Sequence, residues 1–315
     1  MADSASIARL KAEAMQLPSV DLDWQQMGQL EMLLCGGFSP LTGYMLRAEY
    51  ESVLASCRLL DGTAWPVPVT LRLSARQAGT IETGRRIALR DGEGFLLAIM
   101  TVNDKWQGDG VRDRQLVQSS GLNCDVEQEA ETWHLGGSLA GVSMPMHHDF
   151  LSLRYSPTDL RHQYHPNGRE KVLGWLGSQP IHRAQHAFCQ KICREENALL
   201  LLLPFGGGDM AAQADYFSLM RAYQKVLPRF DVRQTKLAML PIPPMKSGLR
   251  EQWLRVILAR NYGCTHVVAG VEQGESQDAI QDEELAAEGF DLAAEAEKIG
   301  LRVVPYPRMQ YVRAR

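Results

Sequence analysis

Short apolar runs alternate with longer amphipathic stretches over the second half of the chain. Strands that alternate with helices predict βαβ units and a mainly parallel sheet, with ligands bound at the carboxyl ends of the strands. We therefore expect an α/β domain over residues 151–315 that holds any small-molecule site. The predicted strands cover residues 172–176, 199–203, 235–240, 266–271 and 301–304, and the predicted helices cover residues 182–196, 215–227, 248–261 and 282–298.

In the first half of the chain the apolar runs are short and closely spaced, and turn residues separate them. Alternating runs on either side of an Asp-Gly turn predict antiparallel hairpins. We therefore expect a β-rich domain over residues 1–150, preceded within it by one helical stretch that ends at Gly36-Gly37. The runs cover residues 67–73, 86–89 and 95–102, the Asp-Gly turn covers residues 91–94, and the helical stretch lies within residues 23–45.

Composition fits two globular domains, because the chain has 315 residues of which 45% are hydrophobic. It carries 33 basic and 37 acidic side chains, a formal net charge of -4. No global field would draw it to nucleic acid or to an anionic membrane, so an anionic ligand needs a local site. No run approaches the roughly 18 apolar residues of a membrane span, and residues 1–17 lack the apolar core of a signal peptide. We expect a cytoplasmic protein.

Several motifs that resemble chemical sites have a simpler structural interpretation. The six cysteines lack a repeated short spacing, and Cys189 and Cys193 on one helix face are better interpreted as buried thiols than as a metal half-site. Residues 147–149, His-His-Asp, have no third ligand placed by spacing, and we expect a structural role there. Residues 205–209, Phe-Gly-Gly-Gly-Asp, lack the lysine of a P-loop and predict a flexible turn. We predict no protein-bound metal.

The most informative segment covers residues 176–185, Leu-Gly-Ser-Gln-Pro-Ile-His-Arg-Ala-Gln, between a predicted strand and a predicted helix. It resembles the signature loop of the ATP sulfurylase (sulfate adenylyltransferase) family, Gln-Xaa-Arg-Asn-Pro-Xaa-His-Xaa-Xaa-His. Pro180 and His182 match the family's proline and first histidine. The family's Gln, Arg, Asn and second His positions hold Leu176, Ser178, Gln179 and Gln185.

The resemblance extends over nearly the whole chain. It implies a PUA-like N-terminal domain followed by a Rossmann-like nucleotidyltransferase domain, similar to the sulfurylase-like domain found beside adenylylsulfate kinase. The small C-terminal subdomain of the family is expected to be absent. The matching segments are residues 30–45, 65–71, 155–161, 240–251 and 261–266.

The reaction implied by this resemblance joins sulfate to the α-phosphate of Mg-ATP and gives adenosine 5′-phosphosulfate and pyrophosphate. Negative charge gathers in its transition state, so cations and N–H donors must neutralise it. The resemblance places Ser178, Met245 and Val271 where the family has arginines, and Gln185 where it has a histidine. We therefore predict weak or no sulfate adenylyltransferase activity, with Mg-ATP as the cofactor only if activity survives.

The same resemblance supplies the candidate site residues. The candidate catalytic residues are His182, Ser178 and Gln185. The candidate nucleotide-binding residues are Gln179, Pro180, Arg250, Gly270, Val271, Glu272, Gln273 and Met309.

Our leading hypothesis is a scaffold or nucleotide-binding protein of sulfate assimilation that binds ATP or adenosine phosphosulfate. It would form a homo-oligomer and work beside an adenylylsulfate kinase, without nucleic acid or membrane. The alternative is an active adenylyltransferase for sulfate or another oxyanion. A third hypothesis, RNA binding by the PUA-like domain, is disfavoured by the acidic charge balance.

Overall fold

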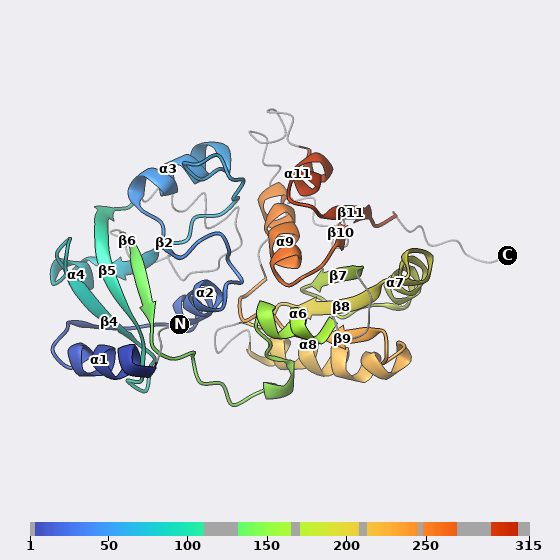
Figure 1. The fold of residues 1–315 in the computed structure, drawn as a ribbon, viewed down its shortest axis with the longest axis horizontal. Helices are drawn as coiled ribbons and strands as arrows, with labels where there is room; N and C mark the ends of the chain where they lie inside the picture. Colours follow the sequence, from blue (N-terminus) through green and yellow to red (C-terminus); the bar gives the residue numbers. More distant parts are fainter. Residues whose placement is uncertain are drawn as a thin grey trace.

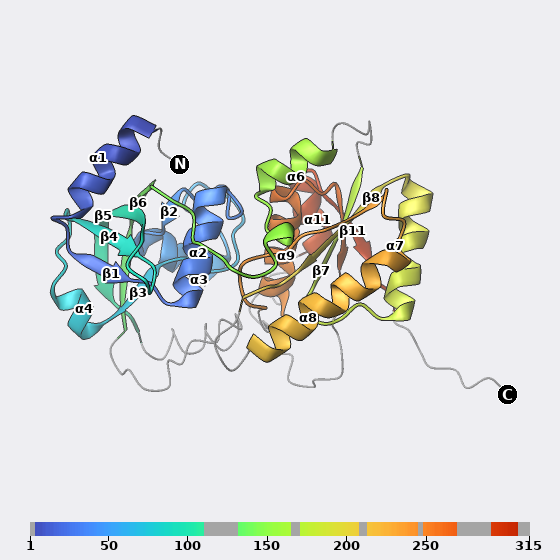
Figure 2. The same cartoon turned by 90° about the horizontal axis from the view of Figure 1, so that it is seen from below.

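The computed structural model describes residues 4–109, 132–164, 171–207, 213–244, 248–269 and 291–307. Within these ranges the chain forms two sheets that lie side by side, each with helices of its own (Figures 1 and 2). The predicted mixed α/β class is confirmed. None of the described helices combines the length and the apolar character that a bilayer span requires.

The N-terminal sheet has the strand order β1-β4-β5-β6-β2, and β3 also pairs with β6. The predicted hairpin is formed by the antiparallel pair β4 and β5, and the carboxylate of Asp91 closes its turn by accepting the N–H groups of Glu93 and Phe95. β1 joins the other edge of β4 as a parallel strand. The strands are β1 Ser19–Asp21, β2 Gly43–Tyr44, β3 Leu71–Ser74, β4 Arg86–Arg90, β5 Leu96–Gln107 and β6 Thr132–Gly141.

The predicted N-terminal helix is α2, which is bounded by residues suited to its ends. Asp23 accepts the N–H of Gln26, whose side chain accepts the N–H of Asp23, and Gly36 ends the helix at a φ of 80°. The other helices of the N-terminal domain were not predicted. α1 shows why, since it buries only Leu10 and Ala14 of its described side chains, which form a narrow apolar stripe. The helices are α1 Ser4–Ala14, α2 Trp24–Cys35, α3 Arg47–Ser56 and α4 Ala75–Gly79.

The C-terminal sheet has the order β11-β10-β7-β8-β9, and each pair of neighbouring strands is parallel. The predicted parallel sheet is confirmed. β9 is shorter than expected, but Ala238 and Leu240 continue alongside β8 through single backbone hydrogen bonds. The strands are β7 Val172–Gly177, β8 Leu199–Pro204, β9 Thr235–Leu237, β10 His266–Ala269 and β11 Arg302–Pro305.

Helices cover both faces of this sheet (Figure 2). Leu200 and Leu202 of β8 pack in one cluster with residues of α7 and α8, whereas Leu199, Leu201 and Leu203 pack with α6, α9 and α11. This alternation is the period of two expected for a strand buried on both faces. The helices are α6 Pro157–Tyr164, α7 Arg183–Glu196, α8 Gln213–Val226, α9 Leu249–Asn261 and α11 Leu292–Lys298, with short 3-10 helices at Leu151–Leu153 and Leu227–Arg229.

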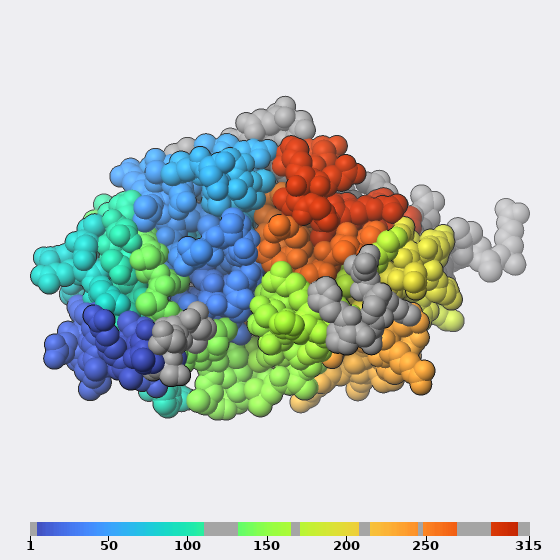
Figure 3. Space-filling model, viewed as in Figure 1, coloured from blue at the N-terminus to red at the C-terminus, as the bar shows by residue number. Residues whose placement is uncertain are grey.

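The hydrophobic core does not end at the boundary between the two domains. One cluster joins residues of α2, β3 and β4 to residues of β7, β8 and α9. In Figure 3 the blue N-terminal segments lie directly against the orange and red atoms of the C-terminal domain. The side chains of Arg250 and Asn261, near the two ends of α9, donate hydrogen bonds to backbone carbonyls of the N-terminal domain. α9 is therefore a shared element of both domains.

Candidate functional site

The segment singled out in the sequence forms the connection between β7 and α7, at the carboxyl end of the parallel sheet. Ser178 is half-buried, Gln179, Pro180 and His182 are exposed, and Ile181 points into the core. Ligands of doubly wound sheets bind in this position, where the loop is followed by a helix N-terminus. The expected strand, loop and helix are thus present in order.

His182 and Gln185 together form the N-terminal cap of α7. Gln185 accepts the backbone N–H of His182 through Oε1 at 2.9 Å, and His182 Nδ1 accepts the backbone N–H of Gln185 at 3.4 Å. Gln185 is buried, whereas His182 is exposed. Because Nδ1 is an acceptor, the neutral imidazole carries its proton on Nε2 and can donate it to a ligand.

The middle of this loop is fixed by two aromatic residues behind it. The hydroxyl of Tyr223, from α8, donates to the carbonyl of Gln179 at 3.0 Å and accepts the indole N–H of Trp175 at 3.2 Å. Tyr223 and Trp175 are both buried. A side chain at Gly177 would collide with the Tyr223 hydroxyl, which explains the glycine at the end of β7.

Arg255 is a site neighbour that the sequence did not reveal. It is buried in α9, forms an ion pair with Glu251, and donates from Nη1 to the carbonyl of Leu176 at 2.5 Å. Its guanidinium also lies 5.3 Å from the ring centre of Phe205, just beyond β8. Spacing alone gives no signal here, since a Glu and an Arg four residues apart on a helix are typical of a solvent-exposed pair.

Arg250 lies at the domain boundary. Its guanidinium donates to the carbonyls of Val53, Leu54 and Pro66 at 2.9 to 3.1 Å, and the side chain is buried. These contacts attach α9 to the N-terminal domain. The described contacts of Arg250 do not test the predicted nucleotide contact, which stays a prediction.

The candidates Gly270, Val271, Glu272, Gln273 and Met309, together with Met245, lie outside the described residues.

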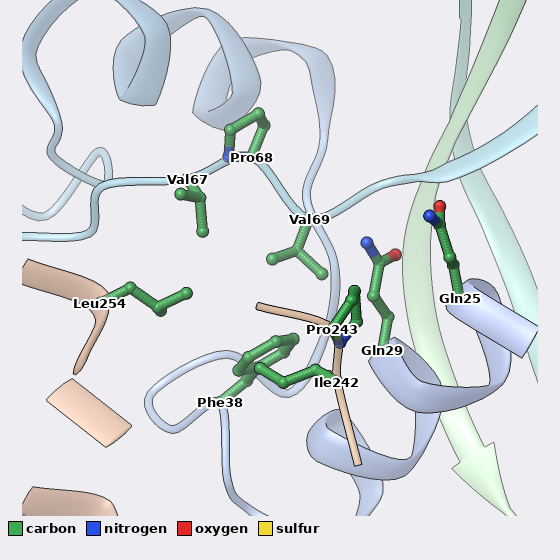
Figure 4. Close-up of a pocket in the computed structure, with 9 residues that line it drawn as sticks. All are labelled: Gln25, Gln29, Phe38, Val67, Pro68, Val69, Ile242, Pro243 and Leu254. Carbon is green, nitrogen blue, oxygen red and sulfur yellow. The ribbon is translucent and has the colours of Figure 1, made fainter. Parts of the chain in front are cut away.

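Two hollows in the described part of the chain lie away from this loop. The first is an apolar cavity of about 20 Å³ between the domains, lined by α2, the segment around Val67, Ile242 and Leu254 (Figure 4). It could hold about one water molecule. The second, of about 410 Å³, lies beside Leu199 and Thr235, at the amino ends of β8 and β9. Because nucleotides bind at carboxyl ends in this kind of sheet, the β7–α7 loop is the better site.

Comparisons with known proteins agree with this architecture. Residues 1–120 match the sequence profile of a PUA-like domain, and residues 151–315 match that of ATP-sulfurylase. This chain belongs to the ATP-sulfurylase family. The expected PUA-like domain followed by a nucleotidyltransferase-type domain is confirmed.

Relatives of the family resemble the whole chain. The sulfate adenylyltransferase of Schizosaccharomyces pombe (strain 972 / ATCC 24843) is 31% identical over 96% of this chain and 64% of its own length. That of Mycosarcoma maydis is 32% identical over 98% of this chain and 56% of its own length. A solved structure, a hexameric APS kinase from Thiobacillus denitrificans, is 40% identical, with a TM-score of 0.81 over 99% of this chain and 56% of that chain. The chain therefore spans 56% to 64% of the length of these proteins.

The His-His-Asp segment between the domains of this ATP-sulfurylase family member has the structural role expected of it. His147 bonds Glu31 of α2 at 2.7 Å, and Asp149 accepts hydrogen bonds from Arg154 and Tyr216 at 2.6 and 2.7 Å. Burial opposes ionisation of Asp149, but these two donors outweigh it and hold the pKa of the carboxyl below its usual value. Among the described residues, no group of three His, Cys, Asp or Glu side chains could hold a metal ion.

Two further expectations concern small residues near the sheet. Cys189 and Cys193 are buried thiols in α7, as predicted, and burial raises the pKa of Cys189 far above its usual value. The flexible turn expected after β8 is wrong for Gly206 and Gly207. The N–H of Gly206 donates to the carbonyl of Leu240, and a Cβ at Gly207 would collide with the backbone of Ile242 and Pro243. Gly207 therefore allows two backbone segments to approach closely.

Proposed function

We propose that this ATP-sulfurylase family member has weak or no sulfate adenylyltransferase activity and acts as a nucleotide-binding scaffold. The observation that carries the proposal is the neutral character of the loop between β7 and α7. Ser178 and Gln185 stand at motif positions where the family has an arginine and a histidine. Gln185 is buried in the helix cap, so its Oε1 serves the protein's own backbone.

The argument for weak activity is electrostatic. Sulfate and ATP are both anions, and adenylyl transfer concentrates their charge at one phosphorus. Removal of a single preorganised donor typically costs roughly a hundredfold to a thousandfold in rate. A serine offers one hydroxyl in place of the bidentate fork of an arginine, so Ser178 and Val271 cannot supply that neutralisation.

The argument for nucleotide binding is that the loop is held in place. Tyr223 fixes the Gln179 carbonyl, and the cap formed by His182 and Gln185 fixes the first turn of α7. A helix N-terminus favours phosphate through its positive dipole end, although the cap already engages the N–H groups of His182 and Gln185 here. His182 Nε2 adds a donor beside it. ATP or adenosine 5′-phosphosulfate fits such a site. Magnesium would accompany ATP as its phosphate-bound ion, without a ligand set from the protein.

The proposal is tested by two measurements on the same sample. Pyrophosphate release with Mg-ATP and sulfate is expected to be at least about a thousandfold slower than that of the S. pombe sulfate adenylyltransferase assayed in parallel. Calorimetric titration with ATP and with adenosine 5′-phosphosulfate is expected to show binding. Comparable turnover would disprove the loss of activity, and absence of binding would disprove the nucleotide-binding role.

A gain-of-function variant sharpens this test. The triple change Ser178→Arg, Gln185→His and Val271→Arg returns the family's residues to three motif positions. Pyrophosphate release is expected to rise at least about tenfold above that of the wild-type chain, because cations again face the oxyanions. The matched control, Ala55→Arg with Val232→Arg, adds two arginines at exposed positions outside the motif and should leave the rate unchanged.

The partner proposal rests on the solved relative, a hexameric APS kinase that covers this whole chain in its fold. We propose a homo-oligomer that works beside adenylylsulfate kinase in the cytoplasm. Light scattering that gives a monomer at micromolar concentration would exclude the oligomer.

A second candidate is adenylyl transfer to a different oxyanion, which is supported by the bonds that hold the loop, from Tyr223 to the Gln179 carbonyl and within the cap of α7. Pyrophosphate release with selenate or molybdate in place of sulfate distinguishes this candidate from the scaffold. Only the candidate transferase is expected to release pyrophosphate with these oxyanions.

A further inference from the structure

Arg255 lies where the carboxyl ends of two central strands meet. Its Nη1 donates to the carbonyl of Leu176 near the end of β7, and its guanidinium faces the ring of Phe205 just after β8. The N–H of Phe205 in turn donates to the carbonyl of Gly177 at 3.1 Å. One buried cation from α9 therefore contacts both strands at the edge that carries the candidate loop.

The ion pair with Glu251 orients this cation. Both side chains are buried, and Glu251 lies one turn before Arg255 on the same helix. A buried ion pair adds little to stability when compared with apolar residues of the same size, because both charges lose their hydration. The ion pair instead orients the guanidinium, because the carboxylate of Glu251 holds the planar group so that Nη1 faces the Leu176 carbonyl.

The Leu176 carbonyl belongs to the peptide that leads into the loop. Its orientation fixes the N and Cα atoms of Gly177, the last residue before the loop, because the peptide unit is planar. On the far side of the loop, Tyr223 holds the Gln179 carbonyl. The loop is thus held from both faces of the sheet, by α9 through Arg255 and by α8 through Tyr223.

We propose that Arg255, oriented by Glu251, is a positioning residue for the nucleotide loop between β7 and α7. This inference rests on the proposed nucleotide-binding function and adds to it a residue that does not need to touch the ligand. A nucleotide binds a preorganised loop more tightly because the loop loses less conformational entropy when the nucleotide binds.

The decisive variant is Arg255→Lys. Lysine keeps the charge that Glu251 requires, but one ammonium cannot pair with Glu251, donate to Leu176 and stack on Phe205 together. Amide hydrogen exchange within residues 177–182 is expected to quicken about tenfold, and affinity for adenosine 5′-phosphosulfate or ATP to fall about tenfold. Exchange in β5 should stay at the wild-type rate.

Arg58→Lys is the matched control, since Arg58 pairs with Glu295 between the domains at 3.0 Å and has no described contact with the loop. It should leave both loop exchange and nucleotide affinity unchanged. The double variant Glu251→Gln with Arg255→Met removes both charges together, so it avoids an unpaired buried carboxylate and should reproduce the loop effects of Arg255→Lys.

Unchanged loop exchange in Arg255→Lys, or faster exchange spread evenly over the whole protein, would overturn the positioning role. If the wild-type protein binds neither nucleotide, the proposed function fails by itself. The exchange rates would then decide the inference alone: selective quickening at residues 177–182 supports it, and unchanged rates overturn it.

Discussion

At the scale of single residues, the candidate site is held by side chains that do not face the ligand. Tyr223 illustrates this, since its hydroxyl connects a buried indole to a loop carbonyl. Buried polar groups that lose such a partner keep their desolvation cost. The candidate site residues are visible in the sequence, whereas those that hold the loop in shape are visible only in the structure.

Replacing Tyr223 by phenylalanine removes one oxygen and leaves both the Trp175 N–H and the Gln179 carbonyl without this partner. We expect the free energy of unfolding to fall by about 1 to 3 kcal/mol, measured by urea denaturation. Tyr44→Phe is the matched control, because the buried Tyr44 hydroxyl has no hydrogen-bond partner among the described residues. Its stability should be unchanged or slightly higher. Equal losses in the two variants would contradict the role of the hydroxyl bridge.

At the scale of elements, α7 is defined at its start by a reciprocal cap and at its end by Asn197 in the left-handed conformation, with a φ of 51°. His182 and Gln185, which the motif resemblance sets at the family's two histidine positions, close the first turn of the helix here. A neutral glutamine at Gln185 is therefore sufficient for the start of the helix.

The capping role predicts the effect of Gln185→Ala. Loss of the bond from Gln185 Oε1 to the His182 N–H should lower the free energy of unfolding by about 0.5 to 2 kcal/mol. Arg183→Ala, at the exposed first position of the same helix, serves as the control and should change stability little, since alanine favours the helix. Thermal denaturation followed by circular dichroism measures both. A Gln185→Ala protein as stable as the control would show that the cap is not required.

At the scale of the whole molecule, the two domains share one core and one helix. Arg250 and Asn261 of α9 bond carbonyls of the N-terminal domain, and apolar residues of both domains pack in one cluster. A continuous core favours cooperative unfolding, because neither domain can lose its packing alone. We therefore expect the two domains to unfold as one structural unit.

Replacing Arg250 by methionine tests whether the two domains unfold together. Three backbone carbonyls, of Val53, Leu54 and Pro66, would lose the hydrogen bond from Arg250, so we expect a loss of about 3 kcal/mol in the free energy of unfolding. Hydrogen exchange of amides in β5 and in β8 reports the two domains separately, and both should lose stability together. Arg47→Met, which breaks an exposed pair with Glu51, should cost less than about 0.5 kcal/mol. A loss confined to β5 would indicate independent domains.

The sequence by itself determined the kind and order of the main elements. The unbroken apolar run of β8, the Asp-Gly turn at Asp91 and the caps around α2 and α7 are local signals, and each acts through its own neighbours in the chain. The same locality places Ser178, Gln179 and His182 on the loop after β7.

Only the tertiary structure decided which buried side chains serve that loop. α9 is buried nearly all round, so no polar face in its sequence shows which side meets the sheet and which meets the N-terminal domain. Arg250 and Arg255 are five residues apart, about 140° around the helix, and point to different partners for that reason. The family resemblance named Arg250 as a candidate nucleotide residue. The structure shows that Arg250 contacts the N-terminal domain, whereas Arg255 contacts the end of β7.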